Sequence, residues 1–187
     1  MGSAIMADIS PDTGIPLAGV EIRLVHGMDE KACRDALVRE HHYLPWRRLS
    51  GKALHHVAIH DDRWPALIGR QVGAFKVGVR DRWIGWTAEQ QFSRLHLVAG
   101  NARHVLPGRD RPRNLASRVP ALSLGRLSAD MMKVHGYPAC LAETFVDISR
   151  FAGTSAGHRE AVHPCCHSRH GERCLHGASA RHRHEVE

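Results

Sequence analysis

The alternation of apolar and polar positions predicts short strands and amphipathic helices between Val20 and Val146. Strands are predicted where aliphatic residues alternate or form short runs, at Val20–Val25, Leu54–His60, Ala66–Val77, Ala102–Pro107 and Ala139–Val146. Helices are predicted where apolar residues recur every three to five positions, at Asp29–His41, Thr87–Val98 and Asn114–His135. This order of elements predicts one α/β domain, with a mixed sheet flanked by helices.

Local signals refine several of these boundaries. Thr87, followed three residues later by Gln90, predicts a capping box at the start of a helix. Asn114 is predicted to be the N-cap of the longest helix. Pro120 lies inside the apolar repeat of that helix, where a proline costs about 3 kcal/mol, and is predicted to kink the helix or delay its start. Asp61–Asp62 is predicted to be the turn of an antiparallel hairpin.

Composition divides the chain into three parts. Residues 1–19 contain Pro and Gly and are predicted to be a flexible N-terminus, and residues 20–154 are predicted to form the domain. The last 33 residues, 155–187, hold seven of the sixteen His and three of the five Cys, with no aromatic residue. Such a segment buries too little apolar surface to offset its ordering entropy, so a tail that is disordered or only locally helical is predicted.

The charge of the chain indicates an anionic partner. The formal net charge is +7, which favours nucleic acid, an acidic cofactor or a phosphorylated ligand; an Arg-rich protein without such a partner is the alternative. No apolar run approaches the roughly 18–20 residues of a membrane span, and no signal peptide is evident, so no membrane association is expected. The odd number of Cys suits a reducing cytoplasm.

The best candidate anion site lies where a basic loop meets the helix that Asn114 begins. The first N–H groups of a helix have no internal acceptors and attract anions. The alternatives are a pyrophosphate, nucleic-acid phosphates or a solvated basic loop. The candidate cofactor-binding residues are Arg103, Arg111, Arg113, Asn114, Leu115, Ala116 and Ser117.

Two carboxylates near the end of the last predicted strand are the candidate catalytic groups. Glu143 and Asp147 could act as a general base or as metal ligands, and burial would raise the pKa of an unpaired Glu143. The favoured alternative is a structural carboxylate paired with an arginine, for example Arg103 on the adjacent strand.

The remaining His, Cys and Trp groups favour structural roles. The doublets His41–His42 and His55–His56 point in different directions, because neighbouring residues do so on helices and strands. Cys165–Cys166–His167 lacks the spacing of a zinc site, so no metal site is predicted. Arg80–Trp86 is predicted to be a compact joint, and Trp83 and Trp86 within it are predicted to pack in the core.

Six sequence blocks stand in a characteristic order: His41–Leu44, Asp81–Trp86, Leu95–Val98, Asn101–Arg103, Asn114–Ser117, and Glu143–Asp147 with Arg150–Thr154. Together these blocks resemble the DruA family, and the match covers about Val20 to Thr154. This resemblance implies a protein of an anti-phage Druantia system or of a mobile element, with defence-system or transposase proteins as partners.

The chain departs from the family pattern at three places. The family continues after Thr154 with Cys-Tyr-Arg-Ala-Ala-Asn-Trp, where this chain has Ser155-Ala-Gly-His-Arg-Glu; a frameshift would explain the change. Pro45 replaces a common Gly, and Pro120 replaces an aliphatic residue. These departures imply a truncated, degraded copy.

The order of elements is also similar to the acetyltransferase-like (GNAT) fold, here incomplete at the C-terminus. In that fold the loop and helix after a central strand hold the coenzyme A pyrophosphate. The similarity implies a coenzyme A thioester as cofactor and an acyltransferase activity that is absent from this copy. A non-catalytic nucleic-acid-binding module is the alternative.

Overall fold

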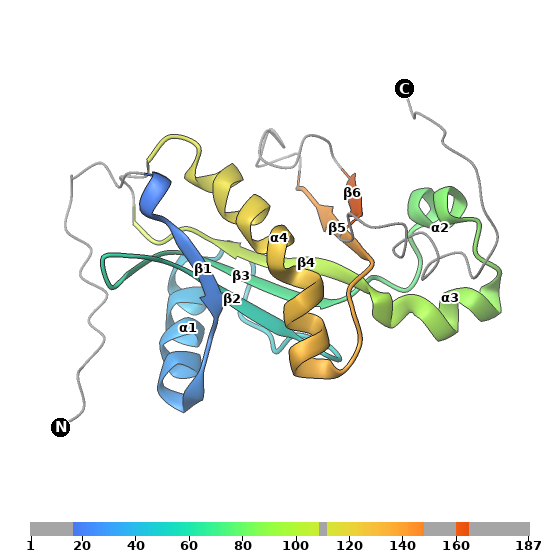
Figure 1. Cartoon of the computed structure of the whole chain (residues 1–187), viewed down its shortest axis with the longest axis horizontal. Coiled ribbons are helices and arrows are strands. Elements are labelled where there is room, and N and C mark those ends of the chain that lie inside the picture. The colour runs from blue at the N-terminus through green and yellow to red at the C-terminus, as the bar shows by residue number, and fades with distance from the viewer. Residues whose placement is uncertain (1–16, 109–111, 148–159, 165–187) are drawn as a thin grey trace.

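A six-stranded sheet with helices on both faces forms the framework of the protein (Figure 1). The computed structural model describes residues 17–108, 112–147 and 160–164. The strands lie in sequence order and pair antiparallel, except β4 and β5, which are parallel. The strands are β1 (Glu21–Leu24), β2 (Leu54–His60), β3 (Arg63–Val72), β4 (Val98–Val105), β5 (Leu141–Phe145) and β6 (Glu160–Pro164). The helices are η1 (Leu17–Gly19), α1 (Gly27–His41), α2 (Gly78–Ile84), α3 (Ala88–Arg94), η2 (Leu95–Leu97) and α4 (Leu115–His135). The predicted mixed sheet flanked by helices is confirmed.

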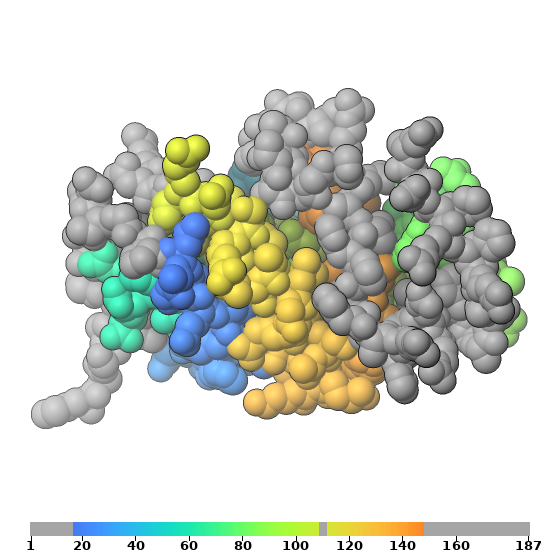
Figure 2. Space-filling model, turned by 45° about the horizontal axis from the view of Figure 1, so that its top comes forward, coloured from blue at the N-terminus to red at the C-terminus, as the bar shows by residue number. Residues whose placement is uncertain are grey.

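The two long helices cover opposite faces of the sheet, and the period of two along the strands explains how. Alternate residues of a strand point to opposite faces. Ile22, Ala58 and Ile68 pack with Leu115 and Val119 of α4. On the other face, Val57, Leu67 and Val105 pack with Leu37 and Val38 of α1. In Figure 2 the yellow atoms of α4 lie beside the blue atoms of β1 on the surface of the molecule.

The predicted β2–β3 hairpin is confirmed, with its turn at Asp61–Asp62. Both aspartates have positive φ, 47° and 61°, as a tight two-residue turn requires. The predicted extension of the second strand to Val77 is wrong, because β3 ends at Val72. Gly73 donates to Val98 O at 2.8 Å, and a Cβ on Gly73 would lie 2.7 Å from Val98 Cγ1. The chain therefore turns out of the sheet at this glycine.

A helical crossover joins the two parallel strands β4 and β5. Asn114 is the N-cap residue of α4, as predicted, but its φ is 67° and its side chain makes no capping hydrogen bond. The helix includes Pro120 and runs without interruption to His135, so the predicted delayed start is wrong. Gly136 ends α4 with a φ of 81°.

The segment between β3 and β4 folds into two short helices. The predicted joint Arg80–Trp86 is mostly helix α2, which ends at Gly85. The capping box of Thr87 and Gln90 is confirmed. The helix after it ends at Arg94, earlier than predicted, because Val98 begins β4 and pairs with Leu141 of β5.

Both predicted flexible ends contain some regular structure. Within the predicted N-terminus, Leu17–Gly19 form the 3-10 turn η1; residues 1–16 lie outside the described part. Within the predicted tail, residues 160–164 form β6, which pairs antiparallel with β5. Without β6, the outer edge of β5 would present unpaired backbone groups. A strand can pair with these groups through its own backbone, so a segment with few apolar side chains can still join the sheet.

Helix α1 begins slightly earlier than predicted. The helix was predicted to begin at Asp29, whereas its N-cap is His26, which makes no side-chain capping bond. The Glu30 carboxylate accepts instead from the His26 backbone N–H at 2.7 Å and from Arg23 at 2.6 and 2.8 Å. This carboxylate therefore satisfies a donor at the helix start and ties β1 to α1.

Candidate functional site

A pocket of about 460 Å³ opens on the α1 face of the sheet. Its walls are α1 and the loop that follows it, and its floor is formed by β2, β3 and β4. The lining residues that matter chemically are Lys31, Arg34, Asp35, Trp46, Arg47, Arg48, His55, Gly69 and Arg103.

The side chains around this pocket, hereafter the basic pocket, give it a positive charge. Among the described residues that line it, five are cations and Asp35 is the one acidic residue. The Asp35 carboxylate is held by Arg34 on the same helix, with Nε at 2.9 Å from Oδ1. The charge of Asp35 is therefore neutralised locally, which leaves the other cations for an anionic ligand.

Arg103 reaches the pocket from β4 and is only partly satisfied. Its Nη1 donates to Ala102 O at 2.7 Å and its Nη2 to Pro45 O at 3.4 Å. Its Nε is buried and has no hydrogen-bond partner among the residues that the structure describes. Burial lowers the pKa of the Arg103 guanidinium, and the positive charge of Arg47 lowers it further, whereas Tyr43 raises it.

The pocket floor combines a neutral histidine with a glycine. Burial and the nearby charge of Arg34 lower the pKa of His55 to about 4, so its ring is neutral at pH 7. A Cβ on Gly69 would lie 3.1 Å from Leu49 Cδ1 and 3.2 Å from Arg103 Cβ. Any larger residue at position 69 would therefore displace the pocket walls.

The predicted cofactor-binding residues do not come together. Arg103 lines the basic pocket on the α1 face, whereas α4, which Asn114 begins, packs on the opposite face. Arg113 and Asn114 are exposed, and Arg111 lies outside the described residues. The N–H of Leu115 donates to Pro112 O at 3.2 Å, and that of Ser117 to Asn114 O at 3.3 Å. Two of the three N–H groups proposed for phosphate, with Ala116 as the third, thus already have acceptors.

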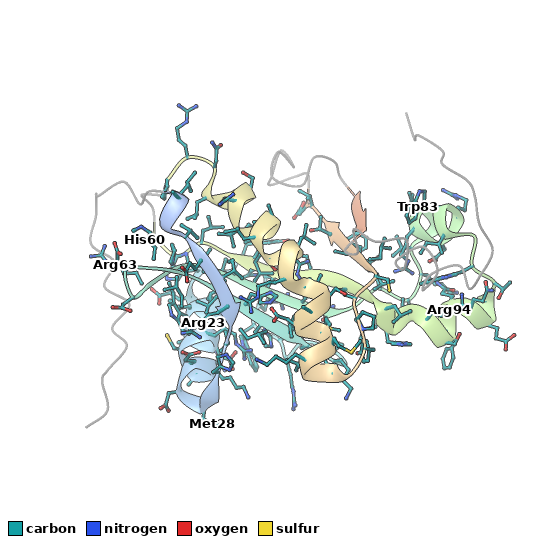
Figure 3. All side chains as sticks on the ribbon, in the orientation of Figure 1. Arg23, Met28, His60, Arg63, Trp83 and Arg94 are labelled. Carbon is teal, nitrogen blue, oxygen red and sulfur yellow. The ribbon has the colours of Figure 1, made fainter. Side chains whose placement is uncertain are left out.

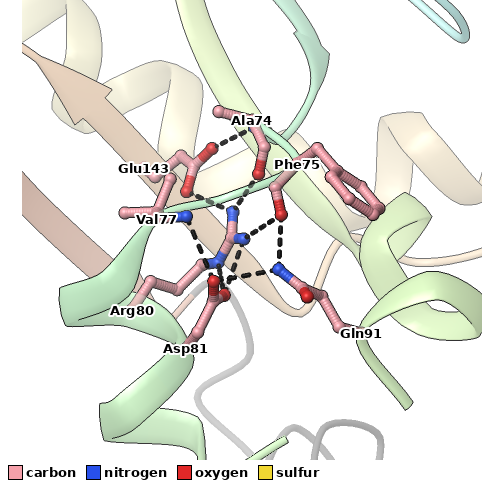
Figure 4. A network of polar contacts seen from close by, with 7 residues as sticks. All are labelled: Ala74, Phe75, Val77, Arg80, Asp81, Gln91 and Glu143. Atoms are coloured by element: carbon pink, nitrogen blue, oxygen red, sulfur yellow. Dashed lines mark hydrogen bonds and ion pairs between the residues drawn. The ribbon is translucent and has the colours of Figure 1, made fainter. Parts of the chain in front are cut away.

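Glu143 is a buried, fully paired carboxylate (Figure 4). Its Oε2 accepts from Arg80 Nη1 at 2.8 Å, and its Oε1 accepts from the Ala74 backbone N–H at 2.6 Å. The favoured prediction of an arginine partner is confirmed, but the partner is Arg80, not Arg103. Arg80 donates further to Ala74 O, Phe75 O and Asp81, so the group fastens α2 to the sheet.

Asp147, the second predicted catalytic carboxylate, is half-buried two residues beyond the end of β5. Among the described residues, no group of three or more His, Cys, Asp or Glu side chains could hold a metal ion. The predicted cluster Cys165–Cys166–His167 falls outside those residues.

Of the two tryptophans predicted to pack in the core at α2, one does so and the other does not. Trp86 packs beside the buried cluster of Ile84 and Val98, as predicted. The core prediction for Trp83 is wrong, because this side chain is 45% exposed. Figure 3 shows Trp83 at one end of the molecule and His60 and Arg63, which flank the β2–β3 turn, at the other end.

Sequence reasoning missed a buried Ser–His–Asp chain beneath α4. His56 Nε2 lies 2.8 Å from Asp130 Oδ2, and Ser123 Oγ lies 3.0 Å from His56 Nδ1. These residue types form hydrolytic triads. Here all three are buried, and Arg70 also donates to Ser123 Oγ at 3.2 Å, so the network packs α4 onto the sheet. The one available signal in the sequence was the spacing of Ser123 and Asp130, which are seven residues apart and therefore lie on the same face of a helix.

The sequence analysis also missed Lys31, Arg34, Arg47 and Arg48 as site residues. The sequence signal that could have indicated them is the group of basic residues on both sides of Pro45. Their convergence with Arg103 depends on the tertiary fold.

The fold and the pocket define a mixed α/β protein with a positively charged cavity on one face of its sheet. The sequence profile of the family described as Druantia protein DruA matches residues 14–170. The chain therefore belongs to the DruA family, as its sequence blocks predicted. No curated protein and no solved structure matches it. None of the helices in the described ranges has the length and apolar character needed to cross a membrane.

Proposed function

We propose that this chain is a phage-defence or mobile-element protein of the DruA family that binds nucleic acid through its basic pocket. Its proposed protein partners are other members of the defence system or a transposase. Family membership supports the biological role. The observation that carries the biochemical role is the convergence of five cations around one cavity, with the single lining carboxylate already paired.

Phosphate contacts make a specific physical signature. Each phosphate of a single strand that is neutralised changes log Kd by about 0.7 per log unit of salt. Contacts from the four pocket cations other than Arg34 would therefore give a slope of about 2.8 at most. A solvated basic face without a specific site would bind only weakly, and removing any pair of exposed cations would weaken that binding equally.

The test is fluorescence anisotropy of labelled single-stranded and duplex oligonucleotides over a series of salt concentrations. Arg47→Ala with Arg48→Ala is expected to weaken binding and to reduce the single-strand slope by about 1.4. The matched control is Lys76→Ala with Arg82→Ala, two exposed cations outside the pocket. A flat salt response, or equal losses in both double variants, would reject the proposal.

A second candidate is a coenzyme A-dependent acyltransferase of acetyltransferase-like architecture. The observation that favours it is the parting of two parallel strands: β4 pairs with β5 only as far as Asn101 and Thr144, but continues to Val105. A crevice at the carboxyl ends of parallel strands is where open α/β sheets bind ligands. The N–H groups of Leu115 and Ser117 already have acceptors, which weighs against a strong pyrophosphate cradle.

Calorimetric titration of acetyl-coenzyme A tests this candidate. Weak binding without turnover is expected for the wild type, and weaker binding for Arg111→Ala with Arg113→Ala. Equal heats of binding in the wild type and the double variant would reject a pyrophosphate site at the start of α4. Measurable turnover would show that the copy is active, with Glu143 and Asp147 as the first carboxylates to replace.

The degraded state of this copy is a separate proposal, supported by the composition after Thr154. The family match continues beyond that residue to position 170. The coding DNA decides the point. A single-base shift near the Ser155 codon should restore the Cys-Tyr-Arg-Ala-Ala-Asn-Trp block, and a frame that restores nothing similar rejects the frameshift.

A further inference from the structure

We propose that the basic pocket seats a single nucleotide unit, with the base against Trp46 and the phosphate against Arg103 and Arg47. This inference rests on the proposed function and specifies the ligand of the same site. Two sources share this chemistry: a free nucleotide, and one nucleotide of a single strand that is turned into the pocket.

The size of the cavity suits a small ligand. A volume of about 460 Å³ lies within the range of roughly 300–1,000 Å³ that is usual for ligand pockets. Such a cavity takes in one nucleotide and not a double helix. Proteins that engage a base individually turn it out of the strand into a pocket of this kind.

Trp46 supplies a surface on which a base can stack. Its side chain lines the pocket and is 38% exposed, although it is a large apolar group. The Arg39 guanidinium lies 4.4 Å from the ring centroid, and Arg39 does not line the pocket. The cation therefore stacks on the indole without being one of the lining residues of the cavity. Aromatic side chains of this kind bind bases in single-strand proteins.

Arg103 and Arg47 supply the matching anion site. Arg47 is close enough for its charge to lower the pKa of Arg103, so the two cations repel each other. The buried Nε of Arg103 has no acceptor within the described part of the chain. A phosphate bound between Arg103 and Arg47, both of which line the pocket, would relieve this repulsion through charge-assisted hydrogen bonds.

His55 and Gly69 suit the space between the two ends of the ligand. The His55 ring is neutral at pH 7, so it can exchange hydrogen bonds with a sugar or a base edge without adding charge. Gly69 leaves the floor open at the point where a Cβ would meet Leu49 and Arg103. The pocket thus offers stacking, neutral and cationic regions in one cavity.

The test compares three small probes by calorimetric titration: adenosine 5′-monophosphate, ribose 5-phosphate and adenosine. The monophosphate is expected to bind roughly tenfold more tightly than ribose 5-phosphate, because only it can stack. Trp46→Leu should abolish this advantage, and Trp46→Phe should retain most of it. Arg103→Ala should weaken both phosphorylated probes, and adenosine should bind weakest.

The matched control is Trp83→Leu, which removes another exposed tryptophan outside the pocket and should change nothing. Unchanged binding of ribose 5-phosphate to Trp46→Leu shows that this variant is folded. Equal binding of the monophosphate and ribose 5-phosphate to the wild type would overturn the inference, as would a Trp46→Leu variant that keeps the difference.

The same variants are then titrated with a short single-stranded oligonucleotide. Losses that parallel those for the monophosphate support a nucleotide seated from a strand. Binding of the monophosphate without the oligonucleotide supports the free nucleotide and rejects the proposed function. Salt-dependent oligonucleotide binding that ignores Trp46, with no binding of the monophosphate, rejects this inference and leaves the proposed function standing.

Discussion

Arg80 shows how one buried charge organises the segment between β3 and β4. Its side chain is fully buried, and it donates to two backbone carbonyls and two carboxylates (Figure 4). A buried ion pair of this kind adds little net stability compared with an apolar pair, but losing one partner strands the other charge. Glu143 would then remain in the core without its cation.

Replacing Arg80 by Met is expected to lower the free energy of unfolding by roughly 3–5 kcal/mol, because the Glu143 carboxylate loses its counter-charge. Urea unfolding measures the change. Arg82→Met, an exposed position in the same helix, should change the free energy by less than about 0.5 kcal/mol. Arg80→Met with Glu143→Gln should lose less than Arg80→Met alone, and a larger loss in the double variant would refute this account.

His56 is the second residue whose environment has a measurable consequence. It faces Asp130 and Ser123 of α4, and the charges of Arg70 and Arg126 lie nearby. Burial lowers its pKa from 6.5 to about 4, although the hydrogen bond to Asp130 acts in the opposite direction. The unfolded state therefore takes up a proton near pH 6.5, whereas the folded state does so only near pH 4.

Stability is accordingly expected to fall as the pH drops from about 6.5 to 4, by on the order of 3 kcal/mol for each of His55 and His56. His56→Gln should remove about half of this pH dependence, whatever its effect at pH 7. Urea unfolding at several pH values between 7 and 4.5 gives the slope. An unchanged slope in the variant would show that His56 is not the titrating group. The pKa of Asp130 is lowered, so its own contribution disappears only at more acidic pH.

At this scale the sequence predicted residue types better than residue partners. A buried, arginine-paired Glu143 followed from its apolar neighbours, but Arg103 was chosen because it lies on the adjacent strand. The actual partner, Arg80, reaches Glu143 because α2 folds back over the end of the sheet. A contact between residues 63 positions apart depends on that fold and leaves no local signal.

At the scale of elements, α4 contains the clearest conflict between sequence and structure. Pro120 lies in the sixth position of a helix that continues to His135. It cannot donate to the carbonyl of Ala116, and its ring crowds that carbonyl. Packing of Leu115, Val119, Leu127 and Met131 against the sheet holds the helix together despite this cost.

Pro120→Ala is expected to raise the free energy of unfolding by about 1–2 kcal/mol. The helix cost of up to about 3 kcal/mol is partly offset, because proline also restricts the unfolded chain. Thermal and urea unfolding provide the measurement. Ala121→Gly, at the exposed neighbouring position, should lower the same free energy by about 1 kcal/mol. A destabilised Pro120→Ala variant would mean that the proline ring itself packs favourably.

Elements with strong local signals were predicted, and those that depend on neighbours were not. The capping box at Thr87 is a local pattern and was found. Helix α2 has only seven residues before its C-cap Gly85. A helix of this length is too short for the apolar repeat to be recognised in the sequence. Strand β3 begins at Arg63, three residues before its predicted start. Both its faces are covered, so the buried run Trp64–Ile68 shows no alternation of apolar and polar residues that would have marked its beginning.

For the whole molecule, the sheet was predictable and the basic pocket was not. The sheet follows from aliphatic runs that lie close together in sequence. The pocket cations come from α1, from the loop after it and from β4, so that Lys31 and Arg103 are 72 positions apart. The sequence therefore indicated an anionic partner through its net charge, but placed the anion site at the start of α4.

The last prediction concerns β6, which completes the sheet inside the predicted disordered tail. Antiparallel pairing with β6 covers the outer edge of β5, from Leu141 to Phe145. Without it, that edge would expose a row of unpaired backbone groups next to the buried residues Leu141 and Ala142. An open edge of this kind loses hydrogen bonds and pairs with other chains.

Deleting residues 155–187 is therefore expected to lower the free energy of unfolding by on the order of 2–5 kcal/mol, from the several backbone hydrogen bonds lost. The truncated protein should also self-associate, which sedimentation velocity detects. Deleting only residues 165–187 keeps β6 and serves as the matched control, with little change expected in either measurement. Equal stability of both truncations and the full chain would show that β6 contributes nothing to stability, and would favour a disordered tail.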